Sequence, residues 1–220
     1  MGLFNFFKKP TAQKSLDNNP SQIVNKLEEL GYFKYATETD IPEIKKEIVD
    51  SLTTLNYLGS VSFDSSPYNS KDYRHYQFDG EDLFEGGGFI WQLQAMKTLF
   101  DKMNFKLEIT NHIEDWDNEK GLNHSITLNG KDYVIFKNFN GYGWGEAAQR
   151  FAEIINDQLE LQNIDESIYL INGGNDGNAV YLTKAQFDLL DPILKGTDRP
   201  LRVEDWCRVN HVAIKNHFQE

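Results

Sequence analysis

Cysteine and basic residues are scarce in this chain. Its single cysteine, Cys207, excludes an intrachain disulfide, as is typical of proteins in a reducing compartment. Its 22 lysine and arginine residues are outnumbered by 34 acidic ones, which gives a net charge of −12. Such a chain repels phosphate backbones, and its densest basic stretches, Lys8–Lys9 and Lys45–Lys46, are short. We therefore expect no nucleic-acid partner.

Long hydrophobic runs are also missing. No uninterrupted apolar stretch approaches the roughly 18 residues of a membrane-spanning helix, so we expect no membrane span. Near the start, Phe4, Phe6 and Phe7 precede the lysines, whereas a secretory signal begins with its charges. Phe6 also occupies the position at which an N-myristoylation signal has Ser or Thr. These features predict a cytoplasmic location.

The common nucleotide-binding motifs are absent as well. The run Gly86–Gly88 opens a predicted helix, but neither the Lys-Ser/Thr of a P-loop nor the G-x-G-x-x-G spacing is present. Glu81, Asp82 and Glu85 precede the run and would repel a phosphate. We therefore interpret the glycines as a turn that lets the start of the helix pack closely.

The chain does have enough apolar residues for one substantial core, since 40% are hydrophobic and 13% aromatic. No linker rich in Pro, Gly or Ser divides its middle. We expect residues 1–19 to form a flexible N-terminal tail and residues 20–220 to form a single domain.

Apolar residues recur at helical spacing in several segments. Ser21 and Gly31 bound the first of two helices that we expect to form an N-terminal helical hairpin. Further helices are predicted at 87–103, at 145–161 and at 183–190. The helix at 87–103 carries an apolar stripe that must face a core: Phe89, Leu93, Met96, Phe100 and Met103.

Elsewhere the pattern alternates with a period of two, which predicts strands. Asn129–Gly130, a strong hairpin signal, lies between two of them. The predicted strands lie at 58–63, 73–79, 105–109, 125–128, 133–136, 167–171 and 179–182. The central order, β-β-β-α-β-β-α, predicts an α+β fold with a mostly antiparallel sheet covered by helices.

His124 is the most specific candidate for catalysis. It shares a predicted strand face with Ile126 and Leu128, where it can act as a general base at the mouth of a pocket. In a hydrolase-like enzyme we expect Asp176 or Glu146 to be the carboxylate beside it. The alternative is a hydrogen-bonded histidine with a structural role at the edge of the sheet.

Two other patterns offer metal-ligating groups. His112 and Glu114 face the same side of a strand, but a metal site usually needs a further ligand from elsewhere in the chain. Cys207 and His211 would be neighbours on a helix, but no second ligand pair accompanies them. We interpret the first pattern as a charged connection between strands and Cys207 as a buried thiol. We therefore expect no metal and no cofactor.

Two predicted loops carry residues suited to binding. Tyr142 and Trp144 stand between a strand and a helix, and exposed aromatic residues are enriched in protein interfaces, although Trp144 can equally pack on the core. The segment 172–178 joins two predicted strands, and its glycines and amides are typical of a loop that a rigid sheet presents. Its candidate binding residues are Asn172, Asn175, Asp176 and Asn178.

These features favour a binding protein with a basic protein partner over an enzyme, because no catalytic motif is strong and the charge is one-sided. One concrete form is an immunity-type protein that neutralises a basic toxin, since opposite charges accelerate the encounter. Two alternatives stand beside it. One is the hydrolase built around His124, and the other is a structural homo-oligomer whose apolar stripe at 89–103 pairs with a copy of itself.

Overall fold

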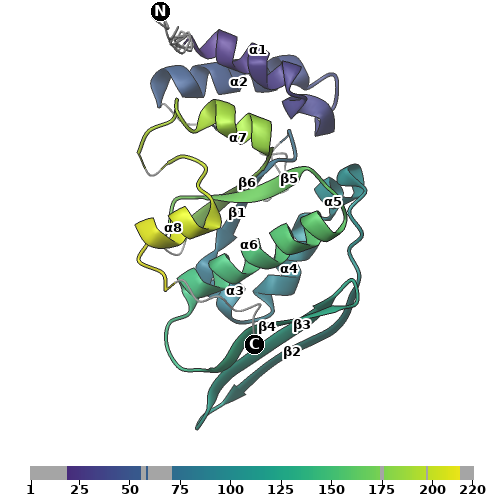
Figure 1. Cartoon of the computed structure of the whole chain (residues 1–220), viewed down its shortest axis with the longest axis vertical. Coiled ribbons are helices and arrows are strands. Elements are labelled where there is room, and N and C mark those ends of the chain that lie inside the picture. The colour runs from purple at the N-terminus through teal and green to yellow at the C-terminus, as the bar shows by residue number, and fades with distance from the viewer. Residues whose placement is uncertain (1–18, 56–57, 59–70, 174–175, 197, 214–220) are drawn as a thin grey trace, which may run out of the picture.

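The computed structural model describes residues 19–55, 58, 71–173, 176–196 and 198–213. Helices and sheets alternate along its long axis in four layers (Figure 1). Each of the two sheets has three strands, and all their strand pairs are antiparallel. The predicted α+β class is therefore confirmed, but the strands form two separate sheets. The predicted strand at 58–63 and the predicted tail lie outside the described residues, except Leu58 and Asn19.

The first layer is formed by helices α1 (Pro20–Glu29), α2 (Ile41–Thr54) and α7 (Lys184–Leu190). The side chain of Asn19, rather than Ser21 as we expected, caps α1. The apolar faces of all three helices are buried against the first sheet. The first two form the N-terminal helical hairpin that the sequence predicts.

The second layer is a sheet in the order β1 (His75–Asp79), β6 (Asp176–Thr183), β5 (Glu166–Ile171). Helices cover both faces of this sheet, which explains why β5 and β6 are apolar on both sides. The last strand, β5, lies at the edge of the sheet. That edge forms the floor of the groove described below.

Helices fill the third layer: α3 (Gly80–Phe84), α4 (Gly88–Ala95), α5 (Lys97–Met103) and α6 (Trp144–Leu161). The helix predicted at 87–103 is divided at Met96, which ends α4 and precedes α5. Its whole apolar stripe is nevertheless buried in the core of the chain. The face on which the oligomer hypothesis depends is thus occupied within one chain.

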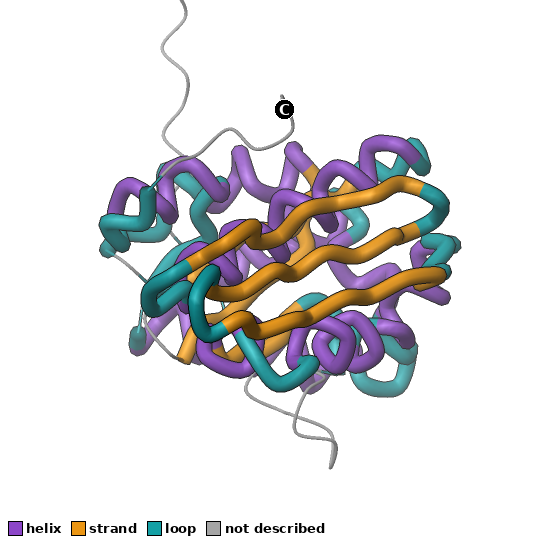
Figure 2. The backbone as a smooth tube through the Cα atoms, turned by 90° about the horizontal axis from the view of Figure 1, so that it is seen from below, coloured by secondary structure: helices purple, strands orange, loops and turns teal. Residues whose placement is uncertain are grey.

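The fourth layer is a meander of β2 (Ile109–Asp117), β3 (Gly121–Leu128) and β4 (Lys131–Phe139). Its inner face packs on the helices, and Figure 2 shows that none of the described helices covers the outer face. The prediction that residues 112–117 form a charged connection between strands is wrong, because these residues belong to β2. The strand predicted at 105–109 shares only Ile109 with β2. The real strand continues to Asp117, and the turn that follows it lies at 118–120.

A buried polar network fastens the helical hairpin to the first sheet. Arg74 is fully buried and donates hydrogen bonds to the carbonyl oxygens of Tyr32 and Tyr181. Its guanidinium lies 3.9 Å from the buried carboxylate of Glu166. Glu166 also accepts a hydrogen bond, at 2.8 Å, from the hydroxyl of Tyr35, which lies in the short 3-10 helix η1 (Tyr32–Tyr35).

Within the described part of the chain, no helix has the length and apolar character that spanning a membrane requires.

Candidate functional site

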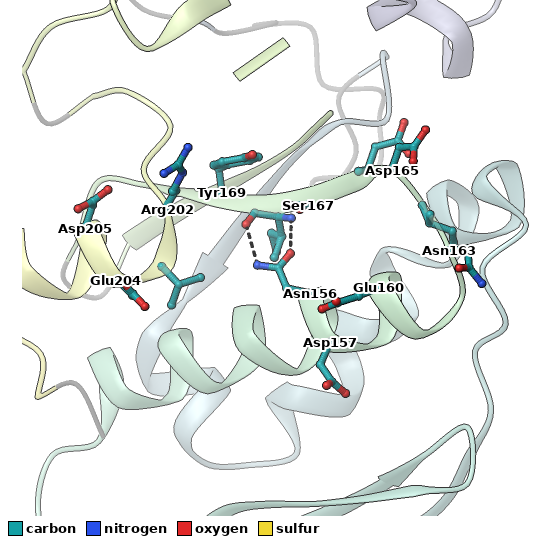
Figure 3. A pocket seen from close by; sticks show the side chains of 14 residues that line it. Asn156, Asp157, Glu160, Asn163, Asp165, Ser167, Tyr169, Arg202, Glu204 and Asp205 are labelled. Atoms are coloured by element: carbon teal, nitrogen blue, oxygen red, sulfur yellow. Dashed lines mark hydrogen bonds between the residues drawn. The ribbon is translucent and has the colours of Figure 1, made fainter. Parts of the chain in front are cut away.

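A groove of about 910 Å³ follows the outer edge of β5. Helix α6 forms one wall, and the start of α8 (Val203–Val209) forms the other (Figure 3). The three elements come from different parts of the sequence, and α8 is held in place by Trp206, which is 1% exposed. The groove is therefore a product of the tertiary fold.

The backbone edge of β5 is already occupied along the floor of the groove. The side-chain amide of Asn156 in α6 donates to the carbonyl oxygen of Ile168 at 3.2 Å and accepts from its N–H at 2.8 Å (Figure 3). The backbone N–H and carbonyl oxygen of Leu170 are likewise occupied, because they form a β-bridge with the backbone of Leu201. An incoming strand cannot pair with these groups, so the side chains of the groove must recognise any ligand.

The lining of the groove is strongly acidic. A single one of its side chains, Arg202, is basic. Six are carboxylates: Asp157, Glu160, Asp165, Glu166, Glu204 and Asp205. Lys131, Lys34 and Arg208 pair with Asp157, Glu166 and Asp205. In contrast, Glu160, Asp165 and Glu204 form no salt bridge with any described residue, and Figure 3 shows them distributed along the groove. These three carboxylates are free to meet a cationic ligand.

Glu166 differs from the other carboxylates because it is buried. Burial raises the pKa of Glu166, but hydrogen bonds from Lys34 and Tyr35 and the charge of Arg74 outweigh it and leave that pKa below its ordinary value. The side chain is therefore ionised at neutral pH and belongs to the polar network of the core. The exposed carboxylates around it form the recognition surface.

A smaller pocket of about 440 Å³ continues the groove around the end of β5. It shares Asp165 and Glu166 with the groove but also contains Lys34 and Lys102. The negative surface thus ends at a pair of lysines. A basic ligand is favoured in the main groove and disfavoured beyond Asp165.

A second cluster of functional groups lies on the inner face of the other sheet. Glu114 in β2 is directly opposite His124 in β3, and His112 is two residues before Glu114 on the same strand face. The Nε2 atoms of His112 and His124 are 2.9 Å apart. One ligand atom from each of the three residues lies within 4.8 Å of the others, so the cluster could hold a metal ion.

His124 is the most deeply buried member of this cluster, with 1% exposure. The rings of Phe89 and Phe136 surround it, at 5.6 and 6.4 Å between ring centroids. Burial and the neighbouring His112 lower the pKa of His124 to about 4, so its imidazole is neutral at pH 7. Its Nδ1 atom is buried and has no hydrogen-bond partner among the described residues.

The glycine run before α4 binds an anion, but that anion is a side chain of the chain itself. The N–H groups of Gly86 and Gly87 donate to the two carboxylate oxygens of Glu114 at 2.8 and 3.1 Å. Both glycines have positive φ values, of 69° and 75°, which point their successive N–H groups toward one carboxylate. The run thus acts as an anion-binding turn that orients Glu114.

We predict that Gly87→Ala destabilises the protein by about 1–2 kcal/mol, because a side chain with a Cβ is strained at positive φ. The space around Gly87 is open, so backbone strain rather than a clash is the cause. Urea denaturation measures the effect. The matched variant Gly87→Asn should lose less, because Asn tolerates this conformation. An equal loss in both variants, or none in either, would contradict this explanation.

No hydrogen bond or ion pair between described residues joins His124 to Glu146, one of the two carboxylates that we expected beside it. Asp176 begins β6 in the other sheet, and its side chain lies outside the described atoms. Glu146 lies in the first turn of α6. The carboxylate opposite His124 is Glu114, which sequence reasoning assigned to a connection. Alternation over 112–114 marked both residues as one strand face, but the turn at 118–120 was needed to place His124 across from them.

The predicted binding loops have different outcomes. Tyr142 is 87% exposed, whereas Trp144 is half-buried at the start of α6 and packs on the core. The backbone carbonyl of Asn172 accepts a hydrogen bond from the indole of Trp206, and Asn178 pairs with the neighbouring strands inside the sheet. Asn175 lies outside the described residues. The others, Tyr142, Trp144, Asn172 and Asn178, do not line the groove.

The pairing of Cys207 with His211 along one helix is wrong. Helix α8 ends at Val209, and His211 follows with a φ of 58°, so the helical spacing does not hold. Cys207 is fully buried, and burial raises the pKa of its thiol to about 12. The interpretation of Cys207 as a buried thiol is consistent with this environment.

Comparison of the chain with protein-family models, with curated proteins and with solved structures found no match.

Proposed function

We propose that this protein binds a basic segment of another protein in the acidic groove between α6, β5 and α8. One observation carries the proposal: six carboxylates and one guanidinium line a groove of about 910 Å³. Three of the carboxylates, Glu160, Asp165 and Glu204, form no salt bridge with any described residue. Lysine and arginine side chains supply the charge that this lining lacks.

The dimensions and chemistry of the groove favour a protein segment over a small apolar ligand. Small-molecule pockets are mostly apolar with a few polar groups, whereas half of the residues that line this groove are charged. Arginine forks match carboxylates in a bidentate manner, which gives geometric specificity as well as charge neutralisation. The blocked edge of β5 makes recognition depend on side chains rather than on an added strand.

A specific form of this function is neutralisation of a basic toxin by an immunity-type protein. The net charge of −12 acts at long range and the groove at short range. Together they accelerate the encounter with a basic partner and orient it. The expected mark of such binding is an association rate that falls steeply as salt is added.

The test compares two variants with equal net charge. One carries Glu160→Gln, Asp165→Asn, Glu204→Gln and Asp205→Asn in the groove. The other carries Glu38→Gln, Glu81→Gln, Glu85→Gln and Glu119→Gln at exposed positions elsewhere. Each should bind a fluorescent oligo-arginine peptide at low ionic strength. We expect the groove variant to lose about tenfold or more in affinity, because each close charge pair contributes on the order of 1 kcal/mol.

The control variant measures how much the overall charge of the protein contributes to the affinity for the peptide. We expect it to lose about threefold or less, because none of its four substituted positions lines the groove, so none forms a close charge pair with a peptide bound there. Equal losses in the two variants would mean that the peptide is attracted to the whole surface and that the groove has no special role. A circular-dichroism melt of each variant shows that the fold is retained.

A further inference from the structure

We propose that His112, Glu114 and His124 form a binding site for a divalent transition-metal ion, with zinc as the best match. The site lies in the fourth layer, in a sheet that contributes nothing to the lining of the acidic groove. It is therefore independent of the proposed partner binding. Two imidazoles and one carboxylate are a ligand set that zinc uses in proteins.

The separation of the ligand atoms is close to what zinc needs. Two nitrogen ligands at Zn–N distances of about 2.0–2.1 Å in a tetrahedral site lie roughly 3.3 Å apart. The Nε2 atoms of His112 and His124 are 2.9 Å apart, and all three ligand atoms lie within 4.8 Å of one another. A shift of a few tenths of an ångström by the half-buried His112 would give the two nitrogens this spacing, and the half-buried Glu114 carboxylate would have to move toward them to complete the site.

The backbone fixes the three side chains on one face without help from the metal. His112 and Glu114 alternate with outward-facing residues of β2, and strand pairing sets His124 opposite Glu114. The amides of Gly86 and Gly87 hold the Glu114 carboxylate, as hydrogen bonds commonly orient a ligating carboxylate from outside the metal site. The remaining lone pairs of that carboxylate are available to an ion.

The burial of His124 also suggests a role beyond packing. His124 is 1% exposed, and its Nδ1 atom has no hydrogen-bond partner among the described residues, which calls for an explanation. The atom that would ligate the ion is Nε2, which faces His112. A plain hydrogen bond between His112 and His124 is the rival explanation, and it predicts no affinity for metal.

The ligand set also determines which ion is preferred. Imidazole nitrogens favour zinc, copper or nickel, whereas magnesium and calcium favour sites built from oxygen atoms. With three protein ligands, a tetrahedral zinc ion keeps one position for water, which is the arrangement of catalytic rather than structural sites. The hydrolase alternative around His124 would require such a position.

The test is calorimetric titration of the EDTA-treated full-length protein with zinc and, separately, with magnesium. Variants His112→Gln and Glu114→Gln remove one ligand each from half-buried positions of an edge strand, where the fold should tolerate the change. The control is His211→Gln, at an exposed histidine distant in sequence from the cluster. We expect the wild type and the control to bind one zinc per chain and neither to bind magnesium with comparable affinity. Each ligand variant should lose about tenfold or more in zinc affinity.

Two further readouts keep the result interpretable. Thermal melts in EDTA show whether each variant folds, and nitrogen shifts of the histidine rings identify which side chains bind the metal. Zinc should move the ring signals of His112 and His124 and leave that of His211 in place. The proposal is overturned if the wild type binds no zinc, if both ligand variants bind it as well as the wild type does, or if His211→Gln abolishes binding.

Discussion

Arg74→Met should destabilise the protein by about 3–5 kcal/mol, the usual cost of removing one member of a buried ion pair. The guanidinium is fully buried, lies between the rings of Tyr32 and Tyr35, and donates to the carbonyl oxygen of Tyr181 at 2.8 Å. Methionine fills part of the same space but leaves that carbonyl unsatisfied. It also leaves the buried Glu166 with fewer positive neighbours.

Denaturation in urea, followed by circular dichroism, measures this loss. Arg199→Met is the matched control, because Arg199 pairs with Asp191 near the surface and should contribute about 0–1 kcal/mol. The double variant Arg74→Met with Glu166→Gln should lose less than the sum of the two single variants, because the two buried residues interact. Equal stabilities of Arg74→Met and Arg199→Met would refute the proposed role of the network.

The same network makes stability depend on acidity. The folded-state pKa of Glu166 lies below its ordinary value, so its contribution is present above the ordinary carboxyl pKa. It is lost as the pH falls through the lowered folded-state value. Removing the charge of Arg74 removes one of the causes that lower this pKa, while the hydrogen bonds from Lys34 and Tyr35 remain. The difference in stability between wild type and Arg74→Met should therefore be largest at neutral pH and shrink in acid.

Trp206→Ala should have the second large effect, again about 3–5 kcal/mol, because it removes a large side chain from the core. Trp206 is 1% exposed, and its indole N–H donates to the carbonyl of Asn172, so it joins α8 to the end of β5. Since α8 forms one wall of the groove, the variant should also weaken binding of the basic peptide. Thermal denaturation and the peptide titration measure the two effects.

Two variants on the same helix separate packing from local disruption. Trp206→Phe keeps most of the buried area but loses the hydrogen bond, so about 1–2 kcal/mol of the loss should remain. Val209→Ala changes a side chain that is 47% exposed and should cost little. A Trp206→Ala protein as stable as Val209→Ala would show that α8 is not fixed by this contact.

Sequence patterns predicted the elements whose signals are local. Thr183 caps α7 with a complete capping box, and Asn129–Gly130 forms the turn between β3 and β4, with both residues at positive φ. The apolar stripe of the predicted helix at 87–103 is buried as expected. These features depend on neighbouring residues alone, which explains why the sequence specifies them directly.

Features that depend on tertiary contacts were not predicted. The division of the strands into two sheets depends on which strands pair with one another. The alternation of apolar and polar residues within a strand is the same whether the strands form one sheet or two. Carboxylates such as Glu160 and Glu204 are far apart in sequence and meet only when α6 and α8 pack beside β5. The partner of the Gly86–Gly87 turn was missed for the same reason, since Glu114 approaches it from another element.

The central claim is that basic ligands bind at the groove rather than across the acidic surface. An NMR titration of the isotope-labelled protein with the oligo-arginine peptide tests it most directly. Our account predicts that shift changes concentrate at 157–168 and 202–205, which line the groove. Changes that spread evenly over the exposed carboxylates, or that centre on the helices of the first layer, would contradict it.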